Sequence, residues 1–232
     1  MKRKLFYTVV ILAGIIAVGA LWAYNKPADT PVALIKKVVQ DVTYKKADME
    51  DWEDAKVGIP LNDGEEVKTG FRSLALVLFT DGSGILRVRE NSILHIYGEK
   101  QEKSLDKNTF IEQGKVGFEV SKQDEDEEFK FTTPTVVASI RGTEGLIYVT
   151  TGATNFYLHR GSAFLQATMG SQQSGTIGAN QVVTIDSTGN MNIIEATQQN
   201  MDDFTQSLQV ETEKVKIETD THKLEIEYFP PE

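Results

Sequence analysis

Short apolar runs separated by turn residues extend from residue 32 to about residue 190, and this pattern limits the possible folds more than any other feature of the chain. Arg72 to Phe79 is largely apolar on both faces, as expected of a buried strand. Residues 116–121 alternate instead, as expected of a strand with one exposed face. Turn signals that recur about every 8–12 residues predict an all-β domain, either sandwich-like or solenoid-like.

The pattern changes near residue 190. Asn200 has the character of a helix N-cap, with two acidic residues in the turn that follows. Met201, Phe204 and Leu208 follow at helical spacing, which predicts one short amphipathic helix packed on the sheet. Residues 215–218 and 223–229 then predict a final β-hairpin, either packed on the body or exchanged with a partner.

The N-terminal segment predicts a membrane anchor. Leu5 to Tyr24 contains no charged residue and follows three basic residues. About 20 apolar residues can cross a bilayer, and basic residues stay on the cytoplasmic side. We therefore expect a single-pass protein of the inner membrane, with its body outside the cytoplasm. A cleaved signal peptide is the alternative, since Val18-Gly19-Ala20 offers small residues for cleavage and would yield a secreted protein.

These features divide the chain into five parts. Residues 1–4 form a cytoplasmic tail, and residues 5–24 form the transmembrane segment. Residues 25–31 are polar and rich in proline, as in a linker. The β domain is predicted at residues 32–190, where Val32 to Val42 forms its first strand. Residues 191–232 form an appendage that consists of the helix and the hairpin.

Charge and cysteine content exclude several classes of function. The formal net charge is -10, and the basic cluster lies before the membrane segment, so the body is strongly acidic. Contacts to phosphate backbones need Lys and Arg, so we expect no nucleic-acid partner. The absence of cysteine excludes disulfides, thiolate nucleophiles, cysteine zinc sites and a lipid-modified N-terminal cysteine.

The segment from Phe129 to Val149 places a charge between two apolar runs. Arg141-Gly142-Thr143 separates strands that both have a buried pattern. Because a lone buried charge is costly, Arg141 is expected to act as an internal clasp that donates hydrogen bonds to turn carbonyls. A ligand contact is the alternative. Gly142 would permit a backbone angle, or a close approach, that a side chain forbids.

No catalytic, cofactor or metal site stands out in the sequence. Asp81-Gly82-Ser83-Gly84 reads as a β-turn, because no helix follows it as in a phosphate-binding loop. Residues 124–128 are acidic and lack calcium-loop spacing, so a solvated hairpin tip is expected. His95, His159 and His222 lie far apart, and none adjoins a serine–acid constellation. Paired carboxylates for glycan hydrolysis stay open, but no pair is singled out.

Several motifs together resemble the FecR-domain family of bacterial extracytoplasmic proteins. They occur in the order Trp52, Gly58-Ile59-Pro60-Leu61, Gly64 to Gly70, Asp81-Gly82-Ser83, Gly114 to Phe118, Phe131 to Pro134, Arg141-Gly142-Thr143, Arg160-Gly161-Ser162 and Ile177 to Val182. The residues assigned to the structural motif are Asp81, Gly82, Pro134, Arg141, Gly142, Thr143 and Gly161. The resemblance implies an all-β domain outside the inner membrane.

In the best-known members of that family, the domain follows a membrane helix and a cytoplasmic anti-sigma domain, and it relays iron-siderophore status. Here only Met1 to Lys4 precede the membrane segment, so sigma-factor regulation is not expected. The expected function is a non-enzymatic scaffold or signal relay that binds another envelope protein. The alternative is a module that binds carbohydrate or peptidoglycan, with Trp52, Tyr97 and Tyr157 as exposed aromatic residues that stack on sugars.

Overall fold

A computed structural model describes residues 31–100, 105–122, 129–209, 213–218 and 223–228. The predicted tail, the predicted membrane segment, all but the last residue of the predicted linker, the acidic run at 124–128 and His222 lie outside these ranges. In the described part of the chain, no helix has the length and apolar character needed to cross a membrane.

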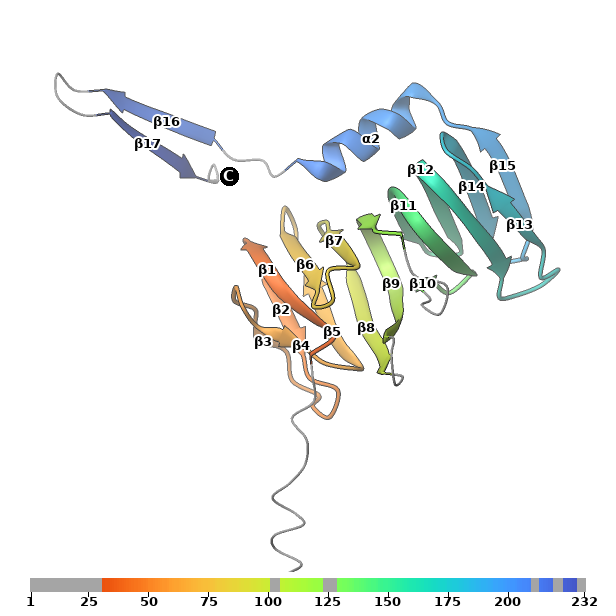
Figure 1. The fold of residues 1–232 in the computed structure, drawn as a ribbon, viewed down its shortest axis with the longest axis horizontal. Helices are drawn as coiled ribbons and strands as arrows, with labels where there is room; N and C mark the ends of the chain where they lie inside the picture. The colour runs from red at the N-terminus through yellow and green to blue at the C-terminus, as the bar shows by residue number, and fades with distance from the viewer. Residues whose placement is uncertain (1–30, 101–104, 123–128, 210–212, 219–222, 229–232) are drawn as a thin grey trace, which may run out of the picture. The chain divides into compact units, whose positions relative to one another are not determined.

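The protein is all-β apart from one helix, and its main sheet contains 15 strands that fold over into two facing layers (Figure 1). This arrangement corresponds to the sandwich-like prediction. The solenoid-like alternative is wrong, because most neighbouring strands are antiparallel and belong to one continuous sheet rather than to stacked coils.

We call the two layers the helix layer and the open layer. The helix layer contains β1 (Ala33–Val39), β4 (Pro60–Leu61), β6 (Leu74–Phe79), β7 (Gly84–Val88), β14 (Gln181–Asp186) and β15 (Met191–Glu195). The open layer contains β2 (Val42–Lys45), β3 (Glu53–Asp54), β5 (Glu65–Thr69), β8 (Ile93–Lys100), β10 (Phe129–Thr132) and β13 (Ser174–Ile177).

Three long strands belong to both layers: β9 (Leu105–Val120), β11 (Val136–Thr150) and β12 (Ala153–Ala167). The first half of β9 pairs with β8 and β10, whereas its second half pairs with β7 and β11. Each long strand carries a glycine with positive φ near its crossing point: Gly114 at 98°, Gly142 at 63° and Gly161 at 90°. Glycine adopts such angles without steric cost, so the strand bends there without ending.

The core lies between the layers and is rich in phenylalanine. The ring centroids of Phe118 in the helix layer and Phe131 in the open layer are 4.8 Å apart. Phe79 and Phe129 form a second pair across the layers at 4.9 Å. All four side chains are fully buried. Such burial stabilises a fold by about 25 cal/mol per Å² of apolar surface, and these pairs hold the folded sheet closed.

The predicted first strand, Val32 to Val42, is in fact two strands. The chain turns at Gln40, whose φ is 57°, and passes from β1 in the helix layer to β2 in the open layer. The backbone N–H of Asp41 donates to Ser73 Oγ at 3.0 Å at this turn. An uninterrupted run of β-forming residues concealed the turn, because neither glycine nor proline marks it.

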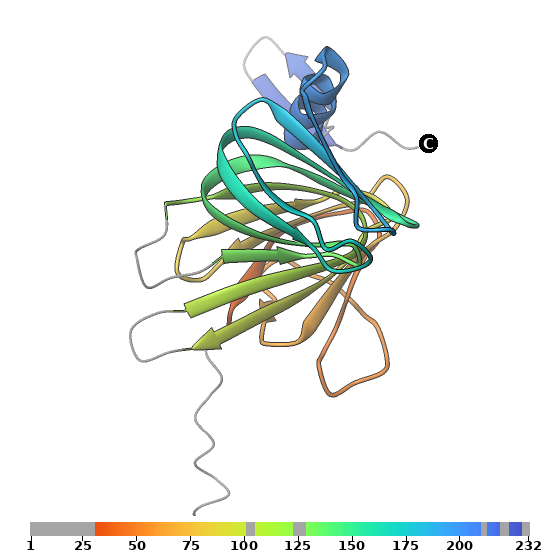
Figure 2. The ribbon, with the colours of Figure 1, turned by 90° about the vertical axis from the view of Figure 1, so that its right-hand side faces the viewer.

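Helix α2 (Gln198–Leu208) covers the outer surface of the helix layer, as its spacing predicts (Figure 2). Phe204 is buried against Leu146, Tyr157 and Val182. The N-cap is Thr197 rather than the predicted Asn200, which instead occupies the third helical position and completes a capping box with Thr197. Both residue types can cap a helix, so sequence alone did not separate them.

The last described element is a hairpin in which β16 (Glu213–Glu218) pairs with β17 (Lys223–Tyr228), at the position where the sequence predicts one. These two strands form a separate two-stranded sheet.

Candidate interaction surface

The outer surface of the open layer presents polar and aromatic side chains from β2, β5, β8, β9 and β12, and we call it the open face. In each strand, alternate residues point into the core, as Leu94 and Ile96 do in β8, so that His95 and Tyr97 point outward. Figure 2 shows α2 on the other side of the folded sheet.

A chain of four charged or titratable groups runs across the open face. Lys45 Nζ lies 2.7 Å from Glu66 Oε1, and the same carboxylate oxygen lies 3.6 Å from His95 Nδ1. His95 Nε2 lies 3.3 Å from Glu112 Oε2. The two carboxylates contact different ring nitrogens, so they do not converge on one point as metal ligands do. In the described residues, no group of three side chains is arranged to hold a metal ion.

Aromatic rings flank this charged chain. The His95 ring lies parallel to Tyr97 at 6.3 Å and contacts Phe110 at 5.3 Å. At the other end, Lys45 Nζ and Lys68 Nζ lie 5.2 and 5.5 Å from the Trp52 ring, as in cation–π pairs. Trp52 is therefore half-buried between lysines. The charged and aromatic groups form one continuous patch across four adjacent strands.

A second row of the open face links Tyr97 to Phe164 on β12. Successive cross-strand partners place them on the same face: Tyr97, Asn108, Lys130, Ser139 and Phe164. Tyr97 is 38% exposed and Phe164 is 49% exposed. Aromatic residues exposed at this level and surrounded by polar groups are typical anchors of protein interfaces. The sequence did not predict Phe164 as a surface anchor, because its neighbours made it look like a core residue.

The predicted sugar-stacking set is not a single surface. Tyr97 lies on the open face, but Tyr157 is 4% exposed and is buried beneath α2 against Phe204, with ring centroids 5.6 Å apart. Burial raises the pKa of the Tyr157 hydroxyl. The expectation that Tyr157 is exposed is therefore wrong. His159 also stacks on Phe204, at 4.9 Å, far from His95 in the fold.

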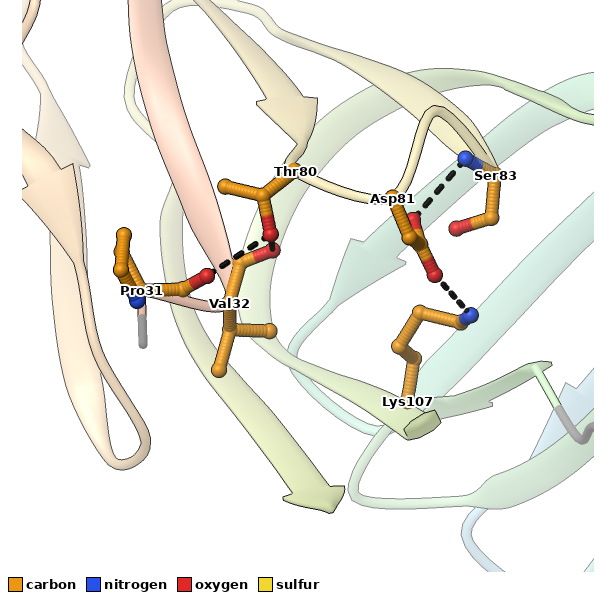
Figure 3. A network of polar contacts seen from close by, with 6 residues as sticks. All are labelled: Pro31, Val32, Thr80, Asp81, Ser83 and Lys107. Atoms are coloured by element: carbon orange, nitrogen blue, oxygen red, sulfur yellow. Dashed lines mark hydrogen bonds and ion pairs between the residues drawn. The ribbon is translucent and has the colours of Figure 1, made fainter. Parts of the chain in front are cut away.

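Asp81 and Gly82 lie in the turn between β6 and β7, as predicted. Asp81 Oδ1 accepts a hydrogen bond from the backbone N–H of Ser83 at 2.9 Å, and Gly82 has φ of 74°. The sequence did not reveal the second partner of this aspartate, Lys107 on β9, whose Nζ lies 2.5 Å from Asp81 Oδ2 (Figure 3). The Lys107 side chain is fully buried, while the Asp81 side chain is 28% exposed.

The Asp81–Lys107 pair joins the two layers. Burial raises the pKa of the Asp81 carboxyl, but the hydrogen bonds from Lys107 and Ser83 outweigh this effect, and the pKa lies below its usual value.

The residue before Asp81 holds the start of the β domain in place. Thr80 Oγ1 donates to the carbonyls of Pro31 and Val32 at 2.7 and 3.2 Å (Figure 3). The β6–β7 turn is thus a structural junction.

Arg141-Gly142-Thr143 is the corner at which β11 crosses between layers, and Arg141 is not the buried clasp that the sequence predicts. Its side chain is exposed, and in the part of the chain that the structure describes it donates to no turn carbonyl. Val136, Ala138 and Ile140 point inward, so the alternation of β11 places Arg141 on the outward face, just before the bulge in the β11–β12 pairing between Arg141 and Glu144. The backbone closes the corner instead, because Gly142 N–H donates to Ser121 O at 3.2 Å.

Gly161 packs against this corner from β12. A Cβ at Gly161 would lie 2.5 Å from Gly142 O and 3.0 Å from the Cα of Thr143, which is itself fully buried. Both distances are below normal contact, so the close approach of the two bent strands requires glycine. The motif residues Gly142, Thr143 and Gly161 therefore meet in space.

Pro134 lies in the turn between β10 and β11 and accepts a hydrogen bond from Thr168 Oγ1 at 2.9 Å. Buried threonines on either side of it form a small polar cluster: Thr133 Oγ1 and Thr135 Oγ1 each lie 2.8 Å from Thr154 Oγ1. This cluster satisfies buried hydroxyls within the core. Among the predicted motif residues, Gly142, Thr143 and Gly161 are brought together, with the exposed Arg141 beside them. Asp81 and Gly82 share one turn, and Pro134 lies in another.

A polar cavity of about 490 Å³ lies beside α2, lined among others by Arg89, Lys115, Tyr148, Asp203, Gln206 and Ser207. Lys115 Nζ lies 5.3 Å from the Tyr148 ring, and Arg89 Nη1 donates to Gln209 O at 2.7 Å. The hydrogen bond from Arg89 holds the C-terminal end of the helix on the sheet.

Comparison with known proteins finds that part of this chain is similar to a family. The sequence model of the family described as FecR protein matches residues 65–164, which include β5, the turn at Asp81, the open-face strands β8 and β9, and the corner at Arg141. No protein among curated sequences matches the chain.

The fold is similar to that in two crystal structures, at 2.50 and 1.65 Å resolution, of "a putative anti-sigma factor from Parabacteroides distasonis ATCC 8503". Each has a TM-score of 0.51 and 14% sequence identity, over 61% of this chain and 64% of that chain. This chain thus matches less than two thirds of the length of these structures, and the likeness is one of fold.

Proposed function

Because residues 65–164 match the FecR family model, we propose that this chain is a non-enzymatic signalling protein of the cell envelope that acts by binding another protein. The similarity in fold to the anti-sigma factor structures supports a regulatory role. The proposal includes the sequence-based expectation that residues 5–24 anchor the protein in the inner membrane with its body outside the cytoplasm.

The composition of the open face is the main support for this proposal. It combines exposed aromatic side chains, Tyr97 and Phe164, with the charged chain from Lys45 to Glu112 on one sheet surface. Protein interfaces typically join aromatic anchors to a polar surround, and charged groups at the rim fix orientation. The strands below are held by a buried core, so this surface is preorganised.

Site-specific photo-crosslinking in growing cells tests the proposal. A photoreactive amino acid replaces Tyr97 in one strain and Phe164 in another, and it replaces Val57, which is 65% exposed and outside the open face, in the control. We expect one discrete protein adduct at both open-face positions and none at Val57, with the partner identified by mass spectrometry. The same adducts at all three positions, or none at positions 97 and 164, would refute this surface.

One observation supports the carbohydrate alternative: the exposed ring of Tyr97 lies beside the polar side chain of Asn108. Asn108 Oδ1 accepts a hydrogen bond from Thr132 Oγ1 at 2.9 Å. Retention of the protein on purified cell-wall sacculi, lost in Tyr97→Ala and kept in Val57→Ala, would favour that function over a protein partner. Cell fractionation with N-terminal sequencing distinguishes a retained membrane anchor at residues 5–24 from a cleaved signal peptide.

A further inference from the structure

Strand β15 lies at one end of the main sheet and pairs with β14. Hydrogen bonds from Ala196 N–H to Asn180 O and from Asp186 N–H to Asn190 O show which residues along β15 bond to β14. Residues 190, 192, 194 and 196 therefore bond to β14, while the intervening residues direct their N–H and C=O groups away from the sheet. Gln173 Oε1 accepts the outward N–H of Met191 at 2.9 Å.

The middle of β15 is apolar, and the strand ends at the exposed Glu195. Ile193 and Ile194 are 41% and 46% exposed, and no charged residue or proline lies before Glu195 in the strand. Natural proteins usually protect an edge strand with charged residues or proline, because unpaired backbone groups beside apolar side chains are a template for another strand. The edge at Ile193 is thus suited to accept an additional strand.

The hairpin of β16 and β17 lacks a third strand. It forms a two-stranded sheet of its own, and such hairpins are marginally stable in water without a third strand or a packing surface. Its sequence alternates charged and apolar residues, and its register sets Val215 opposite Ile226 and Ile217 opposite Leu224.

The connection between α2 and this hairpin is too short for the hairpin to pair with β15 of the same copy. The last turn of α2 lies over β9, because a Cβ at Gly117 would be 3.0 Å from Ser207 Oγ. Strands β11, β12 and β14 separate β9 from β15, which amounts to about 19 Å at the usual strand spacing. The step from Gln209 to Glu213 spans at most about 14 Å.

We propose that the hairpin of one copy pairs with the β15 edge of a second copy, so that two chains exchange hairpins reciprocally and form a dimer. The pairing satisfies the outward backbone groups of Ile193 and supplies the hairpin with a third strand. It does not depend on the function proposed above, because β15 belongs to the helix layer and the open face to the other layer.

Engineered cysteines test this exchange, because the natural chain has none. Full-length copies that carry Asn192→Cys are mixed with larger-tagged copies that carry Glu225→Cys and treated with a short bismaleimide. We expect a crosslinked heterodimer in several-fold higher yield than when Val57→Cys, an exposed site elsewhere, replaces Asn192→Cys. Equal yields would overturn the proposal.

A backbone variant provides an independent test. Ile193→Pro removes an outward N–H and leaves the β14 ladder intact, as prolines at sheet edges do. We expect the dimer dissociation constant, measured by sedimentation of the full chain, to rise about tenfold. Ile193→Val, which keeps the N–H, should leave it within about twofold. Circular dichroism verifies that both variants fold.

A dimer that resists both Ile193→Pro and deletion of residues 210–232 would overturn the exchange, and so would a chain that sediments as a monomer at all concentrations. Either result would leave the photo-crosslinks expected at Tyr97 and Phe164 unaffected.

Discussion

Lys107 and Asp81 illustrate how burial differs between two partners of one ion pair. The ammonium is fully buried, whereas water reaches part of the carboxylate. Removal of one partner from a buried pair typically costs about 3–5 kcal/mol, because the other charge stays uncompensated. The two possible removals should therefore differ in this protein.

We expect Asp81→Asn to lower the free energy of unfolding by about 3–5 kcal/mol, because it leaves the Lys107 ammonium in the core with only a neutral amide. Lys107→Met should cost about 1–2 kcal/mol, since water and the Ser83 N–H still solvate Asp81. Urea titrations of both variants measure the difference. Equal costs, or a larger cost for Lys107→Met, would contradict this account.

The lowered pKa of Asp81 also predicts how stability depends on pH. The unfolded carboxyl has a pKa of about 3.9, so below that value the unfolded state binds more protons than the folded state. The contribution of Asp81 is complete above that pH and is lost as the pH falls through the folded pKa. The decline in unfolding free energy between about pH 4 and pH 2 should be shallower in Asp81→Asn than in the natural protein.

Asp186, whose pKa is also lowered, by hydrogen bonds from Thr188 and Asn190, keeps its own contribution in the Asp81→Asn variant. The slope should therefore decrease without disappearing. An unchanged slope would show that Asp81 does not titrate as a paired group.

Residue roles were predictable where they depend on local turns. Asp81-Gly82 occupies a turn as expected, because turn chemistry is set by neighbours in sequence. Lys107 was missed, because Lys107, Thr109 and Ile111 point inward while the more apolar Phe110 points outward. Arg141 was assigned to the core because apolar runs flank it, but strand alternation places it on the face opposite to the buried Val136, Ala138 and Ile140.

At the level of elements, the crossing strands depend on close backbone contact at their bends. Gly161→Ala should lower the free energy of unfolding by more than about 3 kcal/mol, because it adds a clash with Gly142 O to the strain of a positive φ. Gly82→Ala is the matched control. Its φ of 74° is similarly strained, but nothing lies within 4 Å of the added Cβ, so about 1 kcal/mol is expected.

Thermal or urea denaturation of the two glycine variants isolates the cost of the clash. If Gly161→Ala and Gly82→Ala were equally destabilised, the close approach at the corner would have no energetic role.

Element prediction succeeded where contacts are local and failed where they are not. The spacing of Met201, Phe204 and Leu208 identified α2 and its buried face. The stretch from Phe129 to Val149 reads in sequence as strand, turn and strand. In the structure Arg141-Gly142-Thr143 lies inside β11, and the break expected there is a bend between layers, which depends on pairing with distant residues of β9 and β12.

For the whole molecule, the open face should be separable from stability. The double variant Tyr97→Ala, Phe164→Ala removes two exposed rings, so its melting temperature should stay within a few degrees of that of the natural protein. Truncation of anchor residues at an interface typically costs at least about 2 kcal/mol of binding, or roughly thirtyfold in affinity. We expect that loss for the partner identified by crosslinking, measured by calorimetry.

Val57→Ala serves as the control, because it shortens an exposed side chain outside the open face. Loss of binding in the control, or full binding by the double variant, would show that the interface is not the open face.

The position of β9 has a consequence for how the chain acquires its structure during synthesis. Among the strands that precede it, β4, β1, β6 and β7 form one paired set, and β3, β2, β5 and β8 form another. Strand β9 pairs with both β7 and β8 and so joins the two sets. A nascent chain that ends before residue 105 therefore has two separate small sheets, and formation of the single sheet must wait for distant pairings, which are slow to form.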